Sequence, residues 1–146
     1  MSPFNAFMFI QGLETLALRI REHSKNADEI AKFLMSHPKV ERVSHPSVAS
    51  DLAKERADKY LSGGCGGLMG FEIKGGIEAG KQFINSLEMF YHVANIGDSR
   101  SLAIHPASTT HSQLNEEELL SAGVTPGYVR LSICLLYTSD AADDTN

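Results

Sequence analysis

Residues 92–133 read HVANIGDSRSLAIHPASTTHSQLNEEELLSAGVTPGYVRLSI and hold most of the chemically informative side chains of the chain. Apolar runs at 93–96, 102–104 and 128–133 are separated by segments that contain glycine or proline. Short apolar runs bounded by turn residues predict short strands that end in loops. The expected loops collect neutral hydrogen-bonding side chains, which are Asn95, Ser99, Ser101, Ser108, Thr109, Thr110 and Ser112. The sequence therefore predicts a small sheet with a polar cluster at the ends of its strands.

Arg130 lies inside the last of these apolar runs. Its guanidinium keeps its positive charge, so it needs either an anionic partner or an exit to water. The planar arrangement of its N–H groups matches a carboxylate or a phosphate, and one interpretation is a clamp for the carboxylate of a ligand. From spacing alone, a solvated strand face or a structural ion pair is the commoner explanation for such an arginine.

Helices are predicted before and between the strands. Ser2 and Pro3 are residue types that begin helices, and apolar residues at helical spacing continue to Leu34, so we expect one very long helix or two with a bend. Other expected elements are a strand in 39–45, a helix in 50–61, a strand at 68–73, a helix at 77–90 and a short acidic helix from Asn115 to Gly123. The expected fold class is α+β, with a long N-terminal helix followed by a small, mainly antiparallel sheet that has helices on one face.

Length, composition and charge exclude several classes of protein. The 146 residues suit one domain with a modest core. A formal net charge of −5 leaves no basic stripe, so we expect no nucleic-acid partner. The sequence has no apolar run of about 18 residues and no signal-peptide pattern, so we expect no membrane partner.

Three other kinds of site are weaker interpretations. His92, His105 and His111 do not match a compact zinc-ligand pattern, so we interpret them as structural or surface residues and expect no metal. The glycine cluster at 62–67 precedes a strand rather than a helix, which favours a loop with positive φ over a phosphate cradle. Cys65 has glycine neighbours and no feature that would activate a thiol.

Seven motifs in residues 2–133 resemble one family of enzymes. They are SPFNAF, GLETL, FEIKGG, NIGDSRSL, HPASTTHSQL, SAGVTP and VRLSI. Through them the chain resembles the C-terminal domain of the pyridoxal-phosphate enzymes of cysteine and methionine metabolism, which have fold type I. Within that family it is most similar to the O-acetylhomoserine sulfhydrylases, also called aminocarboxypropyltransferases. The resemblance implies that a long helix links two domains, and that the parent is a cytoplasmic homo-oligomer with pyridoxal 5'-phosphate as cofactor.

The resemblance also implies a reaction and a substrate-binding site. The reaction is γ-replacement, in which sulfide takes the place of acetate on O-acetyl-L-homoserine and gives L-homocysteine, a step of methionine and cysteine biosynthesis. The small-molecule partner is therefore an amino acid. Arg130 matches the arginine that holds its α-carboxylate. Asn95 and Ile96 match the position that helps to fix the same carboxylate, and Thr110 matches a threonine that lines the pocket.

Gln11 and Asn95 favour a sulfhydrylase over its relatives, in which other residues are more frequent at these positions. Cystathionine γ-synthase and methionine γ-lyase remain alternatives within the same family. An alternative of a different class is a freestanding amino-acid-binding domain, in which Arg130 would bind a carboxylate without catalysis.

The resemblance makes both ends of the sequence unusual. Residues 1–133 match a truncated C-terminal domain, whereas residues 134–146, CLLYTSDAADDTN, resemble a translated sequencing adapter and are expected to be disordered. In the family, VRLSI is followed by Gly-Ile-Glu and a closing helix. Without Cys134 only Cys65 remains, which excludes an intrachain disulfide and suits a reducing cytoplasm.

The family's Schiff-base lysine and its other cofactor-binding residues are expected upstream of Ser2. We therefore assign no catalytic and no cofactor-binding residue within this chain. Because the lysine that holds pyridoxal phosphate is missing, this polypeptide alone is expected to be inactive.

Overall fold

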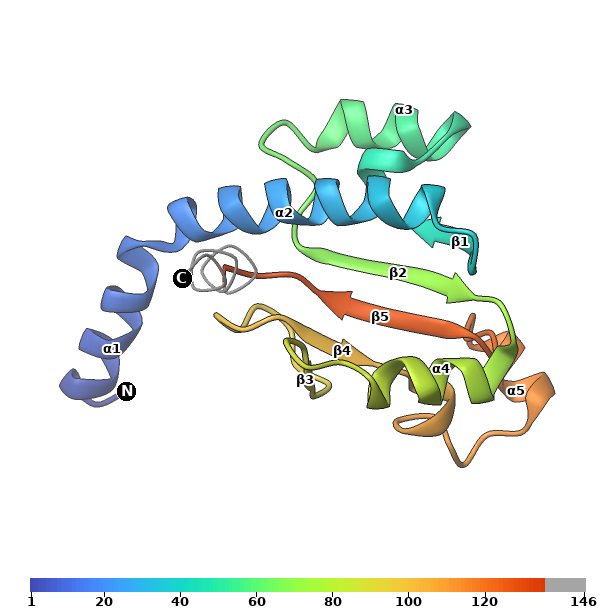
Figure 1. Ribbon diagram of the computed structural model, residues 1–146. Coiled ribbons are helices and arrows are strands. Elements are labelled where there is room, and N and C mark those ends of the chain that lie inside the picture. The colour runs from blue at the N-terminus through green and yellow to red at the C-terminus, as the bar shows by residue number, and fades with distance from the viewer. Residues whose placement is uncertain (136–146) are drawn as a thin grey trace, which may run out of the picture.

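The computed structural model describes residues 1–135, except for the side chains of Asp51 and Glu116 (Figure 1). Of the expected disordered tail, residues 136–146 lie outside the described part. The helices are α1 (Pro3–Glu14), α2 (Leu16–Ser36), α3 (Asp51–Tyr60), α4 (Gly76–Asn85) and α5 (Glu116–Ser121), with short 3-10 turns η1 (Pro46–Val48) and η2 (Pro106–Ser108). The strands are β1 (Val40–Ser44), β2 (Leu68–Ile73), β3 (Tyr91–His92), β4 (Leu102–Ile104) and β5 (Tyr128–Ser132). No described helix is long and apolar enough to cross a membrane.

The predicted N-terminal helix is two helices that meet at Thr15. Ser2 Oγ accepts a hydrogen bond from the Asn5 backbone N–H at 3.2 Å, and Pro3 occupies the first turn, as its fixed φ favours. Helix α1 buries none of its residues, whereas α2 buries one side along its C-terminal two thirds. Figure 1 shows α1 projecting away from the rest of the fold at the start of α2.

The five strands form one sheet in the order β1-β2-β5-β4-β3. Only β3 and β4 pair in parallel, and the other neighbours are antiparallel, so the predicted α+β class and mainly antiparallel sheet are confirmed. The last described strand, β5, lies at the centre between β2 and β4.

The two faces of the sheet have different surroundings. Side chains of a strand alternate between faces, and the register places Met69 opposite Leu131 and Phe71 opposite Val129. This face packs against α2 and α4, and the core formed there consists of Ala27, Ala31, Leu34, Met69, Phe71, Ile84, Ala103, Val129, Leu131 and Ile133. We call the opposite face, to which Gly70, Arg130 and Ser132 belong, the open face.

Two predicted boundaries are wrong. The expected strand at 93–96 is exposed loop, and the strand of this region is β3, two residues earlier. Helix α4 ends at Asn85 instead of continuing to Phe90. The Ser86 side chain donates to the Phe83 carbonyl at 2.8 Å, and the Ser86 N–H donates to the carbonyls of Gln82 and Phe83, which closes the last turn.

The chain beyond β5 is anchored to α2. The Asn26 side-chain amide donates to the Cys134 carbonyl at 2.9 Å, and both residues are buried. The Cys134 sulfur approaches the Ser99 carbonyl at 2.8 Å. Cys134, which we assigned to the tail, is therefore packed against the domain in this structure.

Candidate functional site

Arg130 lies on the open face at the centre of the sheet. It stands opposite Gly70 on β2 and Ile104 on β4, and its side chain is half-buried. Gly70 has no side chain to compete for this space, and a Cβ there would collide with the Tyr128 ring. The Tyr128 ring therefore crosses Gly70 beside the arginine. Arg130, Tyr128 and residues of β1, η1 and α3 line a shallow groove of about 710 Å³.

No acidic side chain described on this face neutralises the Arg130 guanidinium. Among the described residues, the Arg130 side chain forms no ion pair and no hydrogen bond. Glu72, the acidic residue of β2 on the open face, already has two partners. The Arg42 guanidinium lies 3.7 Å from its Oε2, and the Thr125 hydroxyl donates to the same oxygen. Within the described residues, the structural ion pair that could have explained Arg130 is absent.

Asn95 and Ile96 lie in the exposed loop between β3 and β4. The loop is tied to the open face because the Gly97 N–H donates to Ser132 Oγ at 3.3 Å. Ser132 shares a face with Arg130, two residues along β5, which is a separation of about 7 Å in a strand. The Arg100 side chain lies over the Tyr91 ring, 4.7 Å from its centroid, and holds the far end of the loop. The structure thus brings the loop of Asn95 and Ile96 to the side of the sheet that Arg130 occupies.

Thr110 lies in an exposed turn after η2, and its hydroxyl contacts His111 Nδ1 at 2.9 Å. No hydrogen bond links it to the other three predicted residues among those described. The turn is held at its base by His105, whose ring is fully buried. His105 Nε2 lies 2.8 Å from the Pro126 carbonyl and Nδ1 lies 2.8 Å from Ser108 Oγ. His105 thus connects the turn to the segment immediately before β5.

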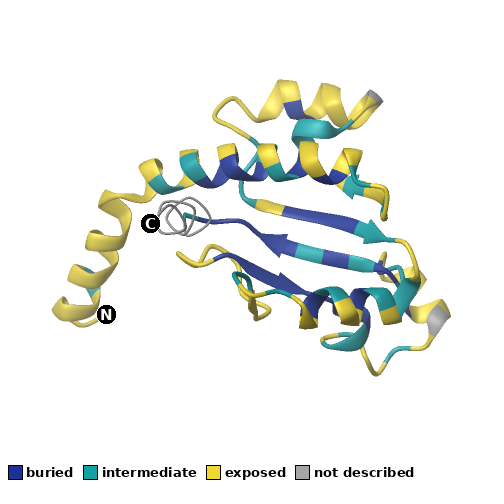
Figure 2. Cartoon of the chain, in the orientation of Figure 1, coloured by how far each residue is buried: buried dark blue, intermediate teal, exposed yellow. Residues whose placement is uncertain are grey.

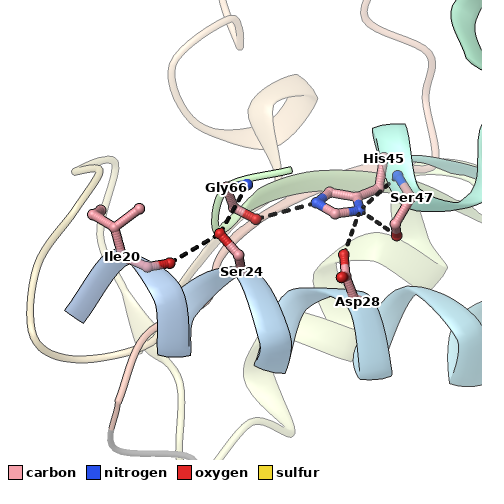
Figure 3. A network of polar contacts seen from close by, with 6 residues as sticks. All are labelled: Ile20, Ser24, Asp28, His45, Ser47 and Gly66. Carbon is pink, nitrogen blue, oxygen red and sulfur yellow. Dashed lines mark hydrogen bonds and ion pairs between the residues drawn. The ribbon is translucent and has the colours of Figure 1, made fainter. Parts of the chain in front are cut away.

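The glycine loop at 62–67 is held by side chains of α2 and of the segment after β1. The Gly66 N–H donates to Ser24 Oγ at 3.1 Å, and the Gly66 carbonyl lies 3.2 Å from His45 Nε2 (Figure 3). The other ring nitrogen of His45 contacts Ser47 Oγ at 2.7 Å and lies 3.8 Å from Asp28 Oδ1. Gly64 and Gly66 have φ of 117° and 79°, so the predicted positive-φ loop before a strand is confirmed. Ser24 and His45 thus use both polar groups of Gly66 to fix the loop.

The predicted histidines have separate structural surroundings. His92 is exposed, His105 is buried and His111 is half-buried. Within residues 1–135, no group of three or more histidine, cysteine or acidic side chains is placed to hold a metal ion.

Sequence reasoning missed Tyr128 and Ser132. Both lie two residues from Arg130 on the same strand face, and one shapes the groove while the other holds the loop. The two-residue period of a strand was the signal that would have grouped them with Arg130.

The comparisons with known proteins agree with this fold. The family model described as Cys/Met metabolism PLP-dependent enzyme matches residues 1–146. The chain belongs to this family. An O-acetyl-L-homoserine sulfhydrylase from Leptospira meyeri is 54% identical over 144 residues, which are 98% of this chain and 33% of that relative.

Two solved structures of this kind match closely. One is a crystal structure of a putative O-acetylhomoserine (thiol)-lyase from Campylobacter jejuni, described with N'-pyridoxyl-lysine-5'-monophosphate. It has a TM-score of 0.82 and 48% identity over 91% of this chain and 32% of that chain. The other is a cystathionine gamma synthase from Xanthomonas oryzae in complex with aminoacrylate and cysteine, with a TM-score of 0.80 and 39% identity over 90% of this chain and 34% of that chain. The chain spans about a third of the length of the relatives it matches.

The family depends on pyridoxal phosphate, but the described residues do not fit a site for it. A Schiff-base lysine has to be enclosed with the cofactor, whereas every lysine of this chain is exposed. They are Lys25, Lys32, Lys39, Lys54, Lys59, Lys74 and Lys81. Three of them form surface ion pairs with neighbours on the same helix. The described part of this chain therefore contains no enclosed lysine that could hold the cofactor.

Proposed function

We propose that this chain is the substrate-carboxylate-binding part of a PLP-dependent enzyme that makes L-homocysteine from O-acetyl-L-homoserine and sulfide. The observation that carries this proposal is the half-buried Arg130, which has no described anionic partner in a groove of the sheet. The 54% identity to a sulfhydrylase along almost the whole chain supports the choice of reaction. Because no described lysine is enclosed, the chain alone is proposed to be inactive.

Arg130 would bind the α-carboxylate through two parallel N–H donors. Hydrogen bonds that involve charged groups contribute about 1.5–3 kcal/mol each, more than neutral ones. The Asn95 amide and the Ile96 N–H would donate to the same carboxylate from the loop held at Ser132, and Thr110 would line the pocket. Holding this end of a zwitterion fixes the direction of its Cα–H bond. In this family pyridoxal phosphate supplies the electron sink, and we assign none of the described residues to holding it.

The test uses the parent enzyme restored from its source DNA, with Arg130→Ala beside Arg42→Ala. Arg42 shares the open face but lies against Glu72. Arg42→Ala therefore removes one guanidinium, as Arg130→Ala does, without removing the proposed carboxylate-binding group. We expect Arg130→Ala to lower kcat/KM about 100-fold or more and Arg42→Ala to change it little. Binding of homoserine is compared with binding of 3-aminopropanol, which lacks the carboxylate, to show whether the effect of Arg130→Ala depends on that group. Arg130→Ala should weaken binding of homoserine only, and an equal loss for both compounds would contradict the proposed role.

A second candidate reaction has its own support, because the Xanthomonas oryzae cystathionine gamma synthase shares the fold at 39% identity. Methionine γ-lyase is the third activity of the family to be considered. Rates of the restored parent with sulfide, with cysteine and without a thiol distinguish the three. A sulfhydrylase turns over fastest with sulfide, whereas the synthase needs cysteine and the lyase needs no thiol.

We further propose that the parent is a cytoplasmic homo-oligomer without a nucleic-acid or membrane partner. Residues 1–133 would be its C-terminal domain, and residues 134–146 would be foreign sequence. Long-read sequencing of the source DNA tests this division. A frame that continues upstream into a lysine-bearing domain, with Gly-Ile-Glu-like sequence after Ile133, would support it. Recurrence of the same start and tail in independent molecules would instead favour a freestanding carboxylate-binding domain.

A further inference from the structure

Arg130 belongs to a square of four residues on the open face of the sheet. The register of β2 with β5 places Gly70 opposite Arg130 and Glu72 opposite Tyr128. Successive residues of a strand belong to opposite faces, so these four positions share one face. Two diagonals cross the square. One joins Glu72 to Arg130, and the other joins Tyr128 to Gly70.

The second diagonal is occupied by the Tyr128 ring. A Cβ at Gly70 would collide with the hydroxyl oxygen, Cζ and Cε2 of Tyr128, so the far end of the ring lies against the Gly70 backbone. Figure 2 shows bands of intermediate burial alternating with buried bands along β5, and Tyr128 and Arg130 are both half-buried. Because the diagonals cross, the ring lies in the path by which the Glu72 carboxylate would reach the Arg130 guanidinium.

Without the ring, Glu72 and Arg130 could form an ion pair. Diagonal neighbours of two antiparallel strands are about 7–8 Å apart, which long side chains can span. The Glu72 side chain is 14% exposed, so water would screen such a pair less than an ion pair on the surface.

The present partners of Glu72 do not prevent this pairing. A carboxylate has about four positions at which it can accept a hydrogen bond. The Thr125 hydroxyl occupies one of them, and the Arg42 guanidinium, on a side chain that is 66% exposed, lies 3.7 Å from the same oxygen. Glu72 therefore keeps the capacity to accept from a second guanidinium, and a steric barrier is needed to keep Arg130 unpaired.

We propose that Tyr128, lying across Gly70, is a positioning residue that keeps Glu72 from pairing with Arg130, so that the Arg130 guanidinium stays available to a substrate carboxylate. The last step rests on the proposed function, whereas the blocking of Glu72 is a property of this chain alone. The aromatic ring provides the barrier and the hydroxyl is not required for it. A side chain that ended before Gly70 would open the diagonal.

The first experiment measures the barrier in the 146-residue chain by double-mutant cycles in urea unfolding. Glu72→Gln and Arg130→Gln are combined, first with Tyr128 present and then with Tyr128→Leu, whose apolar side chain is too short to reach Gly70. Coupling between the two positions should change the folding equilibrium constant less than about 1.5-fold in the unchanged chain and at least about threefold in Tyr128→Leu. Tyr128→Phe retains the ring and should behave as the unchanged chain does. Coupling that is equal with and without the ring would overturn the proposal.

The second experiment measures binding of homoserine to the restored parent enzyme. If Glu72 pairs with Arg130 in most molecules of Tyr128→Leu, only the remaining fraction can bind the carboxylate, so binding should weaken at least about threefold. Adding Glu72→Gln to Tyr128→Leu removes the competing carboxylate and should restore the affinity. Tyr128→Phe should retain it.

The results distinguish this proposal from the proposed role of Arg130. Unchanged homoserine binding by Arg130→Ala would refute the carboxylate-binding role, and the coupling measured in the 146-residue chain would still decide whether the ring blocks Glu72. A loss of binding in Tyr128→Leu that Glu72→Gln does not restore would mean that Tyr128 acts on the substrate itself and would overturn the proposal. A loss in Tyr128→Phe would assign the effect to the hydroxyl and would overturn it as well.

Discussion

Gly80 shows how a buried side chain can restrict the residue type at a neighbouring position. A Cβ at residue 80 would collide with the His105 imidazole, which is fully buried and held by the Pro126 carbonyl on one side and Ser108 Oγ on the other. The ring is fixed at both nitrogens, so it has no direction in which to move away. Position 80 therefore has to be glycine for α4 to lie against the sheet where it does.

We predict that Gly80→Ala lowers the free energy of unfolding by about 1–3 kcal/mol, measured by urea denaturation, because overpacking forces fixed groups apart. Gly12→Ala is the matched control. No atom lies within 4 Å of a Cβ at Gly12, and alanine favours the helix by about 1 kcal/mol, so this variant should be as stable as the unchanged chain or more so. Equal effects of the two substitutions would refute the contact-based explanation.

His23 should make stability depend on pH. It is buried on α2, and no hydrogen-bond partner is present for its Nε2 among the described residues. Burial lowers the pKa of His23 below its ordinary value of 6.5, and the nearby Arg19 charge lowers it further. The unfolded chain therefore binds a proton at this residue more readily than the folded one. Stability from His23 is complete above pH 6.5 and is lost as the pH falls below that value.

The measurement compares unfolding free energies of the unchanged chain and His23→Gln from about pH 8 to pH 5. The unchanged chain should lose more stability than the variant below pH 6.5, with a difference in slope of at most about 1.4 kcal/mol per pH unit. Parallel curves for the two proteins would contradict this account of His23.

At the scale of single elements, α5 depends on its first turn. The Asn115 side chain accepts from the Glu118 N–H at 3.0 Å, while the Glu118 side chain accepts from the Asn115 N–H at 2.9 Å. This capping box was predicted from the sequence and is confirmed. We predict that Asn115→Ala destabilises the protein by about 1 kcal/mol in thermal or urea unfolding. Gln113→Ala, an exposed neighbour outside the box, should have little effect, and equal losses would argue against the cap.

Elements with a strong local signal could be predicted from the sequence. The N-cap at Ser2, the strands at 68–73 and 102–104 and the capping box depend on residues close together in the chain, and all are confirmed. The strand at 93–96 was wrong because its apolar residues are as exposed as those of a loop, with Ile96 at 61%. Periodicity does not reveal whether a short run meets a partner strand, because pairing is decided by distant residues.

For the candidate site, the sequence indicated individual residues but did not reveal the contacts around them. The charge of Arg130 in an apolar strand singled out this residue in the sequence, and its role remains a prediction. That its side chain has no described anionic partner depends on the pairing of Glu72 with Arg42 and Thr125. Those residues come from three separate strands or turns, so only the tertiary structure brings them together. The common location of Asn95, Ile96 and Thr110 around the substrate remains a prediction.

At the scale of the whole molecule, the two ends of the chain contribute unequally to stability. We predict that a chain without residues 1–14 unfolds cooperatively, with a free energy within about 1 kcal/mol of the unchanged chain, because α1 buries no residue. A chain that ends at Gly127 should show no cooperative transition, since β2 and β4 then lose the strand between them. Circular dichroism during urea unfolding tests both, and cooperative unfolding of the shorter chain would contradict the second expectation.

The central position of β5 also has a consequence during synthesis. A ribosome releases β1, β2, β4 and the core-facing side of α2 before β5 is made, and until then β2 has an unpaired edge beside an uncovered apolar face. The nascent chain therefore cannot complete this sheet until β5 emerges from the exit tunnel, and until then the edge of β2 is open to association with other chains.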